Sequence, residues 1–215
     1  MLASWQGTQG AGERLPEPPH RQGPDKPSSE REYGPVDTIV IHATAGSSSV
    51  GALSVMSEGR ASWHVLVPDE DEEDHGRRVL RCVGDGRKAW HVLRKCTHPA
   101  DGRNDINSRS FGVEIVNRQD GRDPFSDWQL QITAEYVDYW RSRYPIRYLT
   151  THAYLDPARK LDPGEGFDWE RFLGYVEAGE RKKKEAGEAE RGGYPPAGTR
   201  VKVVLLPGSR VIDCR

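Results

Sequence analysis

Two histidines in this chain each follow a short run of residues that favours extended structure. His42 comes after Thr38-Ile-Val-Ile41, and His152 comes after Ile146-Arg-Tyr-Leu-Thr-Thr151. Each run predicts a buried strand whose carboxyl end delivers the imidazole. Ligands collect at the carboxyl ends of strands in open α/β sheets, so both side chains are placed for chemistry. For His42 taken alone, a histidine that simply ends a strand is the more economical interpretation.

A carboxylate follows the second histidine at a short distance along the chain. Asp162 lies in the segment Arg159-Lys-Leu-Asp-Pro-Gly164. Two neutral imidazoles and one carboxylate form a three-ligand zinc site whose fourth position is left for water. The three residues come from separate parts of the chain, and they lack the short regular spacing of a zinc finger. The pattern therefore predicts a catalytic zinc centre at His42, His152 and Asp162.

A second acidic residue lies inside an apolar run. In Ser110-Phe-Gly-Val-Glu-Ile-Val116 large apolar residues alternate with Gly112 and Glu114, which predicts a central strand. A carboxylate is costly to bury in such a strand unless it has a partner or a task, and a metal-bound water would supply both. A structural salt bridge is the alternative interpretation of Glu114.

These residues belong to a series of segments that together resemble a known family. In order along the chain, the segments are Ile41–Gly46, Ser62–His64, Ala89–His91, Asn107–Asn117, Thr151–His152 and Arg159–Trp169. They resemble the motifs of the type 2 N-acetylmuramoyl-L-alanine amidases, a group related to the phage lysozyme-type amidases and the peptidoglycan recognition proteins. The resemblance covers roughly residues 36 to 176.

The resemblance implies an activity and roles for individual residues. The bond cut would be the amide between the lactyl group of N-acetylmuramic acid and the L-alanine of the stem peptide, in peptidoglycan or muropeptides. Zinc at the three ligands would activate water, Glu114 would act as general base, and Lys160 would stabilise the oxyanion. The positions expected to bind substrate are Trp63, His64, Trp90, His91 and Asn117. For Trp90, a role as a core anchor is an equal alternative.

Some positions depart from the family's pattern. Ala43 stands where many relatives carry a second histidine or an aromatic residue, and Trp63 stands where some carry a catalytic tyrosine. Leu161 replaces a small polar residue, and Ala158 replaces a glycine. Because all three expected ligands are present, we expect activity.

Two other classes of function compete with the hydrolase. Some peptidoglycan recognition proteins bind the same ligand without cleaving it, and these have lost a zinc ligand. Asp162 argues against that alternative here. A serine hydrolase is disfavoured because the chain has no Gly-x-Ser-x-Gly segment, and the cysteines have no local signature of a cysteine hydrolase.

Composition excludes further classes. The chain has 215 residues, and 31 lysines and arginines against 33 acids give a formal net charge of -2, so no basic footprint for nucleic acid is present. No apolar stretch is long enough for a secretory signal or a membrane span. We expect a protein that is cytoplasmic as synthesised, which fits a recycling enzyme, an endolysin released by other means, or an exported effector. The oligomeric state is left open.

The pattern along the chain predicts an α/β fold with a single central mixed β-sheet flanked by helices and the zinc site at the strand ends. Residues 1–35 are expected to be a flexible Pro/Gly-rich leader, 36–178 the amidase domain and 179–200 a charged linker. Residues 201–215 are expected to form a β-hairpin or to begin a further element.

The acidic run 69–74 is expected to be a solvated loop rather than a calcium site. The three cysteines form no disulfide framework, although Cys82 and Cys96 could pair.

Overall fold

The computed structural model describes residues 16–23, 28–32, 34–59, 61–191 and 202–203. Its seven-stranded sheet has the order β1-β5-β4-β7-β3-β8-β9. The strands are β1 (Arg21–Gln22), β3 (Thr38–Ala43), β4 (Val65–Val67), β5 (Leu80–Arg81), β7 (Ser110–Ile115), β8 (Tyr148–Thr151) and β9 (Lys202–Val203). A separate two-stranded sheet pairs β2 (Ser28–Glu30) with β6 (Arg87–Ala89).

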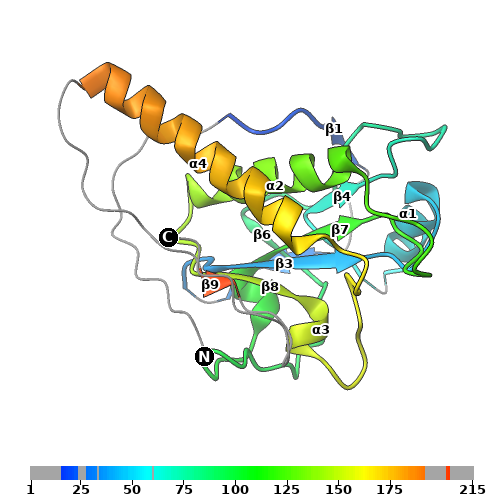
Figure 1. The fold of residues 1–215 in the computed structure, drawn as a ribbon. Coiled ribbons are helices and arrows are strands. Elements are labelled where there is room, and N and C mark those ends of the chain that lie inside the picture. The colour runs from blue at the N-terminus through cyan, green and yellow to red at the C-terminus, as the bar shows by residue number, and fades with distance from the viewer. Residues whose placement is uncertain (1–15, 24–27, 33, 60, 192–201, 204–215) are drawn as a thin grey trace.

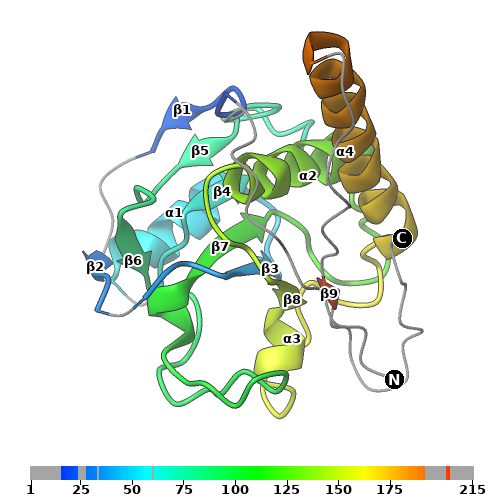
Figure 2. The same ribbon diagram turned by 90° about the vertical axis from the view of Figure 1, so that its left-hand side faces the viewer.

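The centre of the large sheet is parallel. β3 pairs in parallel with β7 on one side and with β8 on the other, and β7 pairs in parallel with β4. Among the described strands of this large sheet, only β4 and β5 pair antiparallel, so the sheet is mixed, as the sequence predicted. The order is visible from the side in Figure 2. The four strands β4, β7, β3 and β8 therefore present their carboxyl ends at the same edge of the sheet.

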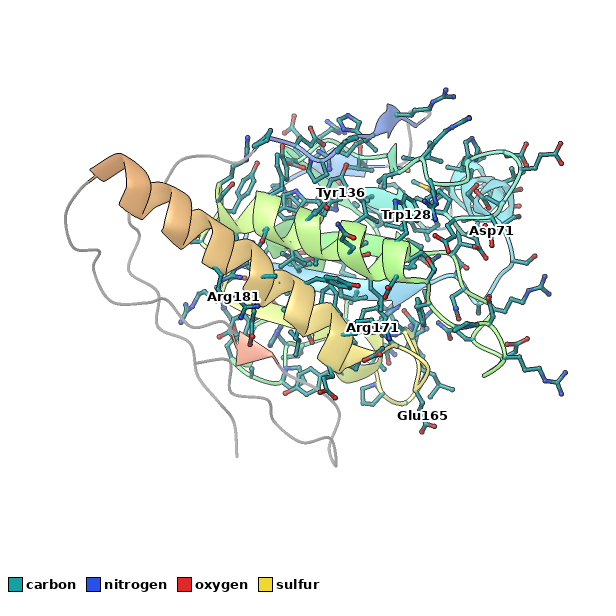
Figure 3. The ribbon with its side chains drawn as sticks, turned by 45° about the horizontal axis from the view of Figure 1, so that its top comes forward. Asp71, Trp128, Tyr136, Glu165, Arg171 and Arg181 are labelled. Atoms are coloured by element: carbon teal, nitrogen blue, oxygen red, sulfur yellow. The ribbon has the colours of Figure 1, made fainter. Side chains whose placement is uncertain are left out.

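Two long helices cover one face of the sheet. α2 (Asp127–Arg141) and α4 (Trp169–Arg191) lie side by side above β3 and β7 (Figure 1). Alternate residues of β3 and β7, including Ile39 and Phe111, enter the core beneath them, and the ring of Phe111 stacks on Trp140 at 4.5 Å. α2 begins with the capping box that Ser126 and Gln129 predict. Figure 3 shows Trp128 and Tyr136 along α2, and Arg171 and Arg181 along α4.

Two smaller apolar clusters cover parts of the opposite face of the sheet. α1 (Ser49–Ser57) packs over Leu66 of β4, and a separate apolar cluster around Val40 of β3 includes Leu155 of α3 (His152–Leu155). A 3₁₀ turn, Ile106–Arg109, leads into β7 beside that second cluster. Because side chains alternate along a strand, His42 and Glu114 lie on this face rather than on the one covered by α2 and α4.

Of the flexible leader expected for residues 1–35, the structure describes 16–23, 28–32 and 34–35, and part of these residues packs against the domain. Part of this segment adds a strand to the sheet, since Arg21 N–H donates to the Val79 carbonyl at 2.8 Å and Gly23 N–H donates to the Arg81 carbonyl at 2.7 Å. A few residues later the guanidinium of Arg31 is inserted among backbone carbonyls of the domain. Backbone hydrogen bonds of this kind depend little on side-chain composition, so the composition of a Pro/Gly-rich stretch did not predict the strand.

The carboxyl-terminal part is described only to Arg191 and again at β9. α4 continues to Arg191, so the first part of the expected 179–200 linker is helical. β9 pairs in parallel with β8 at the sheet edge. The expected hairpin over 201–215 lies outside the described residues apart from Lys202–Val203.

Three smaller expectations can be compared with the structure. Cys82 and Cys96 are both buried thiols that are not joined to each other, so the optional disulfide is not formed. The run 69–74 forms turns beside α1, where Asp71 is exposed (Figure 3). Within this run, the carboxylate of Glu72 accepts the Ser49 N–H at 2.8 Å at the start of α1. Over the described part of the chain, no helix is both long and apolar enough to cross a membrane.

Candidate metal centre

Three buried side chains converge at the carboxyl ends of β3 and β8. The Nδ1 atoms of His42 and His152 lie 3.0 Å apart. Oδ2 of Asp162 lies 3.2 Å from the His42 nitrogen and 3.1 Å from the His152 nitrogen. They form the only group of this kind found over the described ranges. The three residues that the sequence singled out as metal ligands are therefore brought together.

Strand register explains this convergence. In the parallel pair of β3 and β8, Ile41 is aligned with Thr151, so the next residues on the two strands are His42 and His152. Thr151 ends β8 and caps α3, its hydroxyl accepting the Tyr154 N–H at 3.0 Å. Asp162 returns to the same edge, held by a hydrogen bond from the Ala153 N–H to its carbonyl at 3.0 Å.

The donor atoms fit a tetrahedral zinc ion. With metal–ligand bonds of about 2.0–2.1 Å, tetrahedral geometry places ligand atoms about 3.3–3.4 Å apart. The observed triangle of 3.0, 3.1 and 3.2 Å is a few tenths of an ångström tighter. Two imidazole nitrogens and one carboxylate oxygen are also a donor set typical of zinc, and three protein ligands leave a fourth position open.

The charge balance favours a cation at this point. Burial, reinforced by the neighbouring His152, lowers the pKa of His42 to about 4, so this imidazole is neutral and can act as a ligand at pH 7. Burial alone would raise the pKa of Asp162, but its contacts with His152 and His42 outweigh that effect and keep its pKa below the usual range. The site therefore combines a neutral nitrogen donor at His42 with an ionised carboxylate at Asp162, which is what metal binding requires.

Glu114 lies beside the ligand triangle on β7. It is aligned with His42 across the β3–β7 pair, and its side chain is on the same face of the sheet. None of the described residues hydrogen-bonds to its carboxylate, so the structural salt bridge considered from the sequence is absent there. Burial, followed by the charge of Asp162, raises its pKa well above the ordinary value, and Lys160 offsets this only in part. A carboxyl group in such surroundings is suited to taking up and releasing a proton.

Lys160 and Leu161 precede the third ligand. Lys160 is half-buried, and its positive charge acts on both Glu114 and His42. Leu161 is 77% exposed and faces solvent. The short turn that delivers Asp162 therefore places a cation close to the site and an apolar side chain outside it.

Three of the residues expected to bind substrate have structural partners instead. Trp63 is 4% exposed and packs in the apolar cluster under α1. His64 is fully buried, and its Nδ1 accepts the Gly112 N–H at 3.0 Å. Asn117 holds a turn, donating to the Asp123 carbonyl at 2.7 Å. Each side chain is covered by the fold, so these three positions differ from the expected groove lining.

The remaining two expected substrate residues differ from each other. Trp90 is 41% exposed, and its indole N–H donates to the Ser29 hydroxyl at 3.1 Å, so it is neither a core anchor nor covered, and its contact with substrate stays a prediction. His91 is buried, and its Nδ1 lies 2.9 Å from Nε2 of the ligand His42. His91 therefore contacts the ring nitrogen of His42 that does not face His152 and Asp162.

Sequence reasoning missed two residues around His91. Nε2 of His91 lies 3.0 Å from the hydroxyl of Ser110, and Gly112 leaves the space that the His91 ring occupies. An isolated glycine in a strand often marks a close approach of another group, so Gly112 carried a usable signal. Ser110 carried none, because a serine at the start of a strand is common.

Comparison with known proteins gives consistent matches. Residues 32–165 match the family model of N-acetylmuramoyl-L-alanine amidase. The chain is 35% identical over 86 residues to the 1,6-anhydro-N-acetylmuramyl-L-alanine amidase AmpD of Citrobacter freundii, covering 38% of this chain and 44% of that protein.

Two solved structures have a similar fold. A complex of the Escherichia coli amidase AmiD with anhydro-N-acetylmuramic acid-L-Ala-D-γ-Glu-L-Lys is 27% identical, with a TM-score of 0.57 over 68% of this chain and 60% of that one. A selenomethionine derivative of AmpD is 24% identical, with a TM-score of 0.59 over 75% of this chain and 96% of that one, and this likeness concerns the fold alone. The chain matches less than half of the length of the Citrobacter relative.

Proposed function

Because the chain belongs to the N-acetylmuramoyl-L-alanine amidase family, we propose that it is a zinc-dependent hydrolase of the amide bond between N-acetylmuramic acid and L-alanine. The observation that carries this proposal is the buried triangle of His42, His152 and Asp162, with Glu114 beside it on the neighbouring strand. A zinc ion held by these three ligands supplies Lewis-acid activation of a water molecule.

The chain's own residues account for the movement of protons. Glu114 takes the proton of the attacking water and gives it to the nitrogen of the leaving L-alanyl group. Its raised pKa supports this role, since a carboxylate that holds a proton more readily than usual can carry one between the two steps. Lys160 stabilises the negative charge that develops on the substrate's carbonyl oxygen.

The substrate class follows from the relatives. The AmiD structure is described as a complex with a substrate that contains anhydro-N-acetylmuramic acid joined to a peptide beginning with L-alanine. We propose muropeptides or peptidoglycan carrying the same linkage as the substrate here.

A non-catalytic peptidoglycan-binding module is the competing function. Such a module would keep the fold and the ligand surface without hydrolysis. The intact ligand triangle and the buried, unpaired Glu114 favour the enzyme, because neither is needed for binding alone and a buried carboxylate is costly.

Glu114→Gln tests the proposal. We expect the variant to retain one zinc ion per chain and to release free L-alanyl peptide from anhydro-muropeptide about 10²- to 10⁴-fold more slowly than wild type, measured by liquid chromatography and mass spectrometry. Glu165→Gln is the matched control, because Glu165 is exposed and extends outward from the loop before α4 (Figure 3), and it should leave the rate unchanged.

The outcomes separate the two functions. Wild-type turnover by Glu114→Gln would remove Glu114 from the mechanism. A wild-type protein that contains no zinc and binds muropeptide without releasing an amine would favour the binding module. Running the same assay on intact sacculi and on small muropeptides distinguishes a wall-degrading enzyme from a recycling one.

A further inference from the structure

The second nitrogen of the ligand His42 has a partner of its own. With Nδ1 facing His152 and Asp162, Nε2 of His42 points into the domain and lies 2.9 Å from Nδ1 of His91. The two rings meet edge to face, with an interplanar angle of 90°. A metal-bound Nδ1 carries no proton, so Nε2 must carry it and donate it to His91.

The same reasoning fixes the proton on His91. If Nδ1 of His91 accepts from His42, its Nε2 carries the proton and donates to the Ser110 hydroxyl at 3.0 Å. The Ser110 hydroxyl in turn donates to the Ile106 carbonyl at 2.7 Å. Each donor in this series therefore faces an acceptor. The last acceptor is a backbone carbonyl, which cannot donate, so the direction of all the hydrogen bonds is fixed.

The backbone of β7 holds the His91 ring in place. A Cβ atom at Gly112 would lie 2.7 Å from Cγ and 2.9 Å from Nδ1 of His91, closer than real side chains approach. Only glycine at this position leaves room for the ring beside His42. His42, His91 and Ser110 are all buried, so water does not compete for their hydrogen bonds.

The other histidine ligand lacks such support. Nε2 of His152 is buried and has no hydrogen-bond partner within the part of the chain that the structure describes. Of the two histidines in the triangle, only His42 has a hydrogen-bond partner for its second ring nitrogen among the described residues. Second partners of metal-binding histidines orient the ring and raise its basicity.

From this arrangement we propose that His91 is a positioning residue that holds His42 in the metal-binding tautomer and orientation, through the series His42, His91, Ser110 and the Ile106 carbonyl. This inference depends on the metal site of the proposed function. It replaces the substrate-binding role that the sequence indicated for His91, and it makes Gly112 a structural requirement of the site.

The test is the zinc affinity of purified variants, measured by competition with a chromophoric chelator. We expect His91→Phe to bind zinc about 10- to 100-fold more weakly than wild type. His91→Asn retains an acceptor near the position of Nδ1 and should stay within about threefold of wild type, which a merely space-filling role would not predict. His98→Phe is the matched control, because His98 is a fully buried histidine outside the site, and its zinc affinity should be unchanged.

Each outcome decides one question. Zinc affinity of His91→Phe within twofold of wild type, or an equal loss in His91→Asn, would overturn the role of His91 while leaving the proposed function intact. A wild-type protein that binds no zinc would overturn the proposed function, and with it any role toward a metal.

Nitrogen-15 spectra of the zinc-loaded wild type provide a readout that does not depend on the folding of a variant. We expect the Nε2 proton of His42 to exchange slowly and to show coupling across the hydrogen bond to Nδ1 of His91. Ser110→Ala should accelerate this exchange, because His91 then loses the acceptor that fixes its own tautomer. Rapid exchange in the wild type, or the proton on Nδ1 of His42, would overturn the inference.

Discussion

Replacing Arg31 by methionine measures how far the amino-terminal segment belongs to the folded domain. The guanidinium donates to the carbonyls of Asp85 at 3.0 Å, Ser108 at 2.9 Å and Ser110 at 3.2 Å. It also lies over the ring of Phe111, 5.1 Å from the centroid. Arg31→Met keeps much of the length of the side chain and removes every one of these polar contacts.

Two opposing contributions determine how much Arg31→Met changes the free energy of unfolding. Four carbonyls lose a donor, because Nη1 also donates to the Asn107 carbonyl at 3.3 Å, and each loss costs about 1–3 kcal/mol. Against this, burial lowers the pKa of Arg31 from its ordinary value to about 10, so relief of the buried charge returns about 3 kcal/mol. With about 2 kcal/mol for each of the four carbonyls, the balance is a loss of about 5 kcal/mol in the free energy of unfolding at neutral pH, where Arg31 is still charged.

Urea denaturation of the metal-free protein measures this loss. Arg21→Met is the control, because Arg21 lies on β1 with an exposed side chain, and we expect it to change the free energy of unfolding by less than about 0.5 kcal/mol. If Arg31→Met matches wild type within the same margin, residues 28–32 add nothing to stability, and the flexible leader expected from composition is the better description.

Three further predictions concern the metal, the pH dependence and a helix cap. Asp162→Ala should abolish both stoichiometric zinc binding and turnover, because two imidazoles alone form a poor site, as measured by metal analysis and peptide release. Burial lowers the pKa of His98 to about 4 from 6.5, so the unfolded state binds its proton first and stability falls as pH drops from about 6.5 toward 4. His98→Asn should therefore reduce the loss of unfolding free energy between pH 7 and pH 5 by about 2 kcal/mol, measured in urea at both pH values. Ser126→Ala removes the acceptor for the Gln129 N–H at 3.2 Å and should cost about 1 kcal/mol of unfolding free energy.

Each of these three predictions would be contradicted by a specific result. Retained stoichiometric zinc in Asp162→Ala would show that another residue is the third ligand. An unchanged difference between the two pH values in His98→Asn would assign the acid sensitivity to the other buried histidines. An unaltered urea midpoint in Ser126→Ala would mean that water replaces the cap at no cost.

The ligand triangle could be anticipated from the sequence because its signals are local. A β-branched run that ends in histidine predicts both the strand and the position of the imidazole at its end, and this holds for His42 and His152. The alternation around Glu114 likewise predicted a central strand with a buried carboxylate, and β7 is that strand. Parallel pairing then brings such residues to one edge without further information from the sequence.

The surroundings of the site could not be anticipated in the same way. Whether Trp63 or His91 contacts substrate depends on which elements cover it, and a single chain carries no local signal for that. The resemblance suggested a groove, whereas packing under α1 buries Trp63 and close approach to Gly112 buries His91. The strand β1 escaped notice because its pairing is made by backbone groups.

The spacing of the ligands along the chain has a consequence for stability. His42 is separated from His152 by 110 positions and from Asp162 by 120, so in an unfolded chain the donor atoms are scattered. A cation would thus bind the folded domain and not the unfolded chain. At a free concentration of 100 times its dissociation constant, it would raise the free energy of unfolding by about 2.7 kcal/mol. Chelation would then loosen the entire domain, so sensitivity to heat or proteases would report occupancy of the centre as directly as loss of hydrolysis.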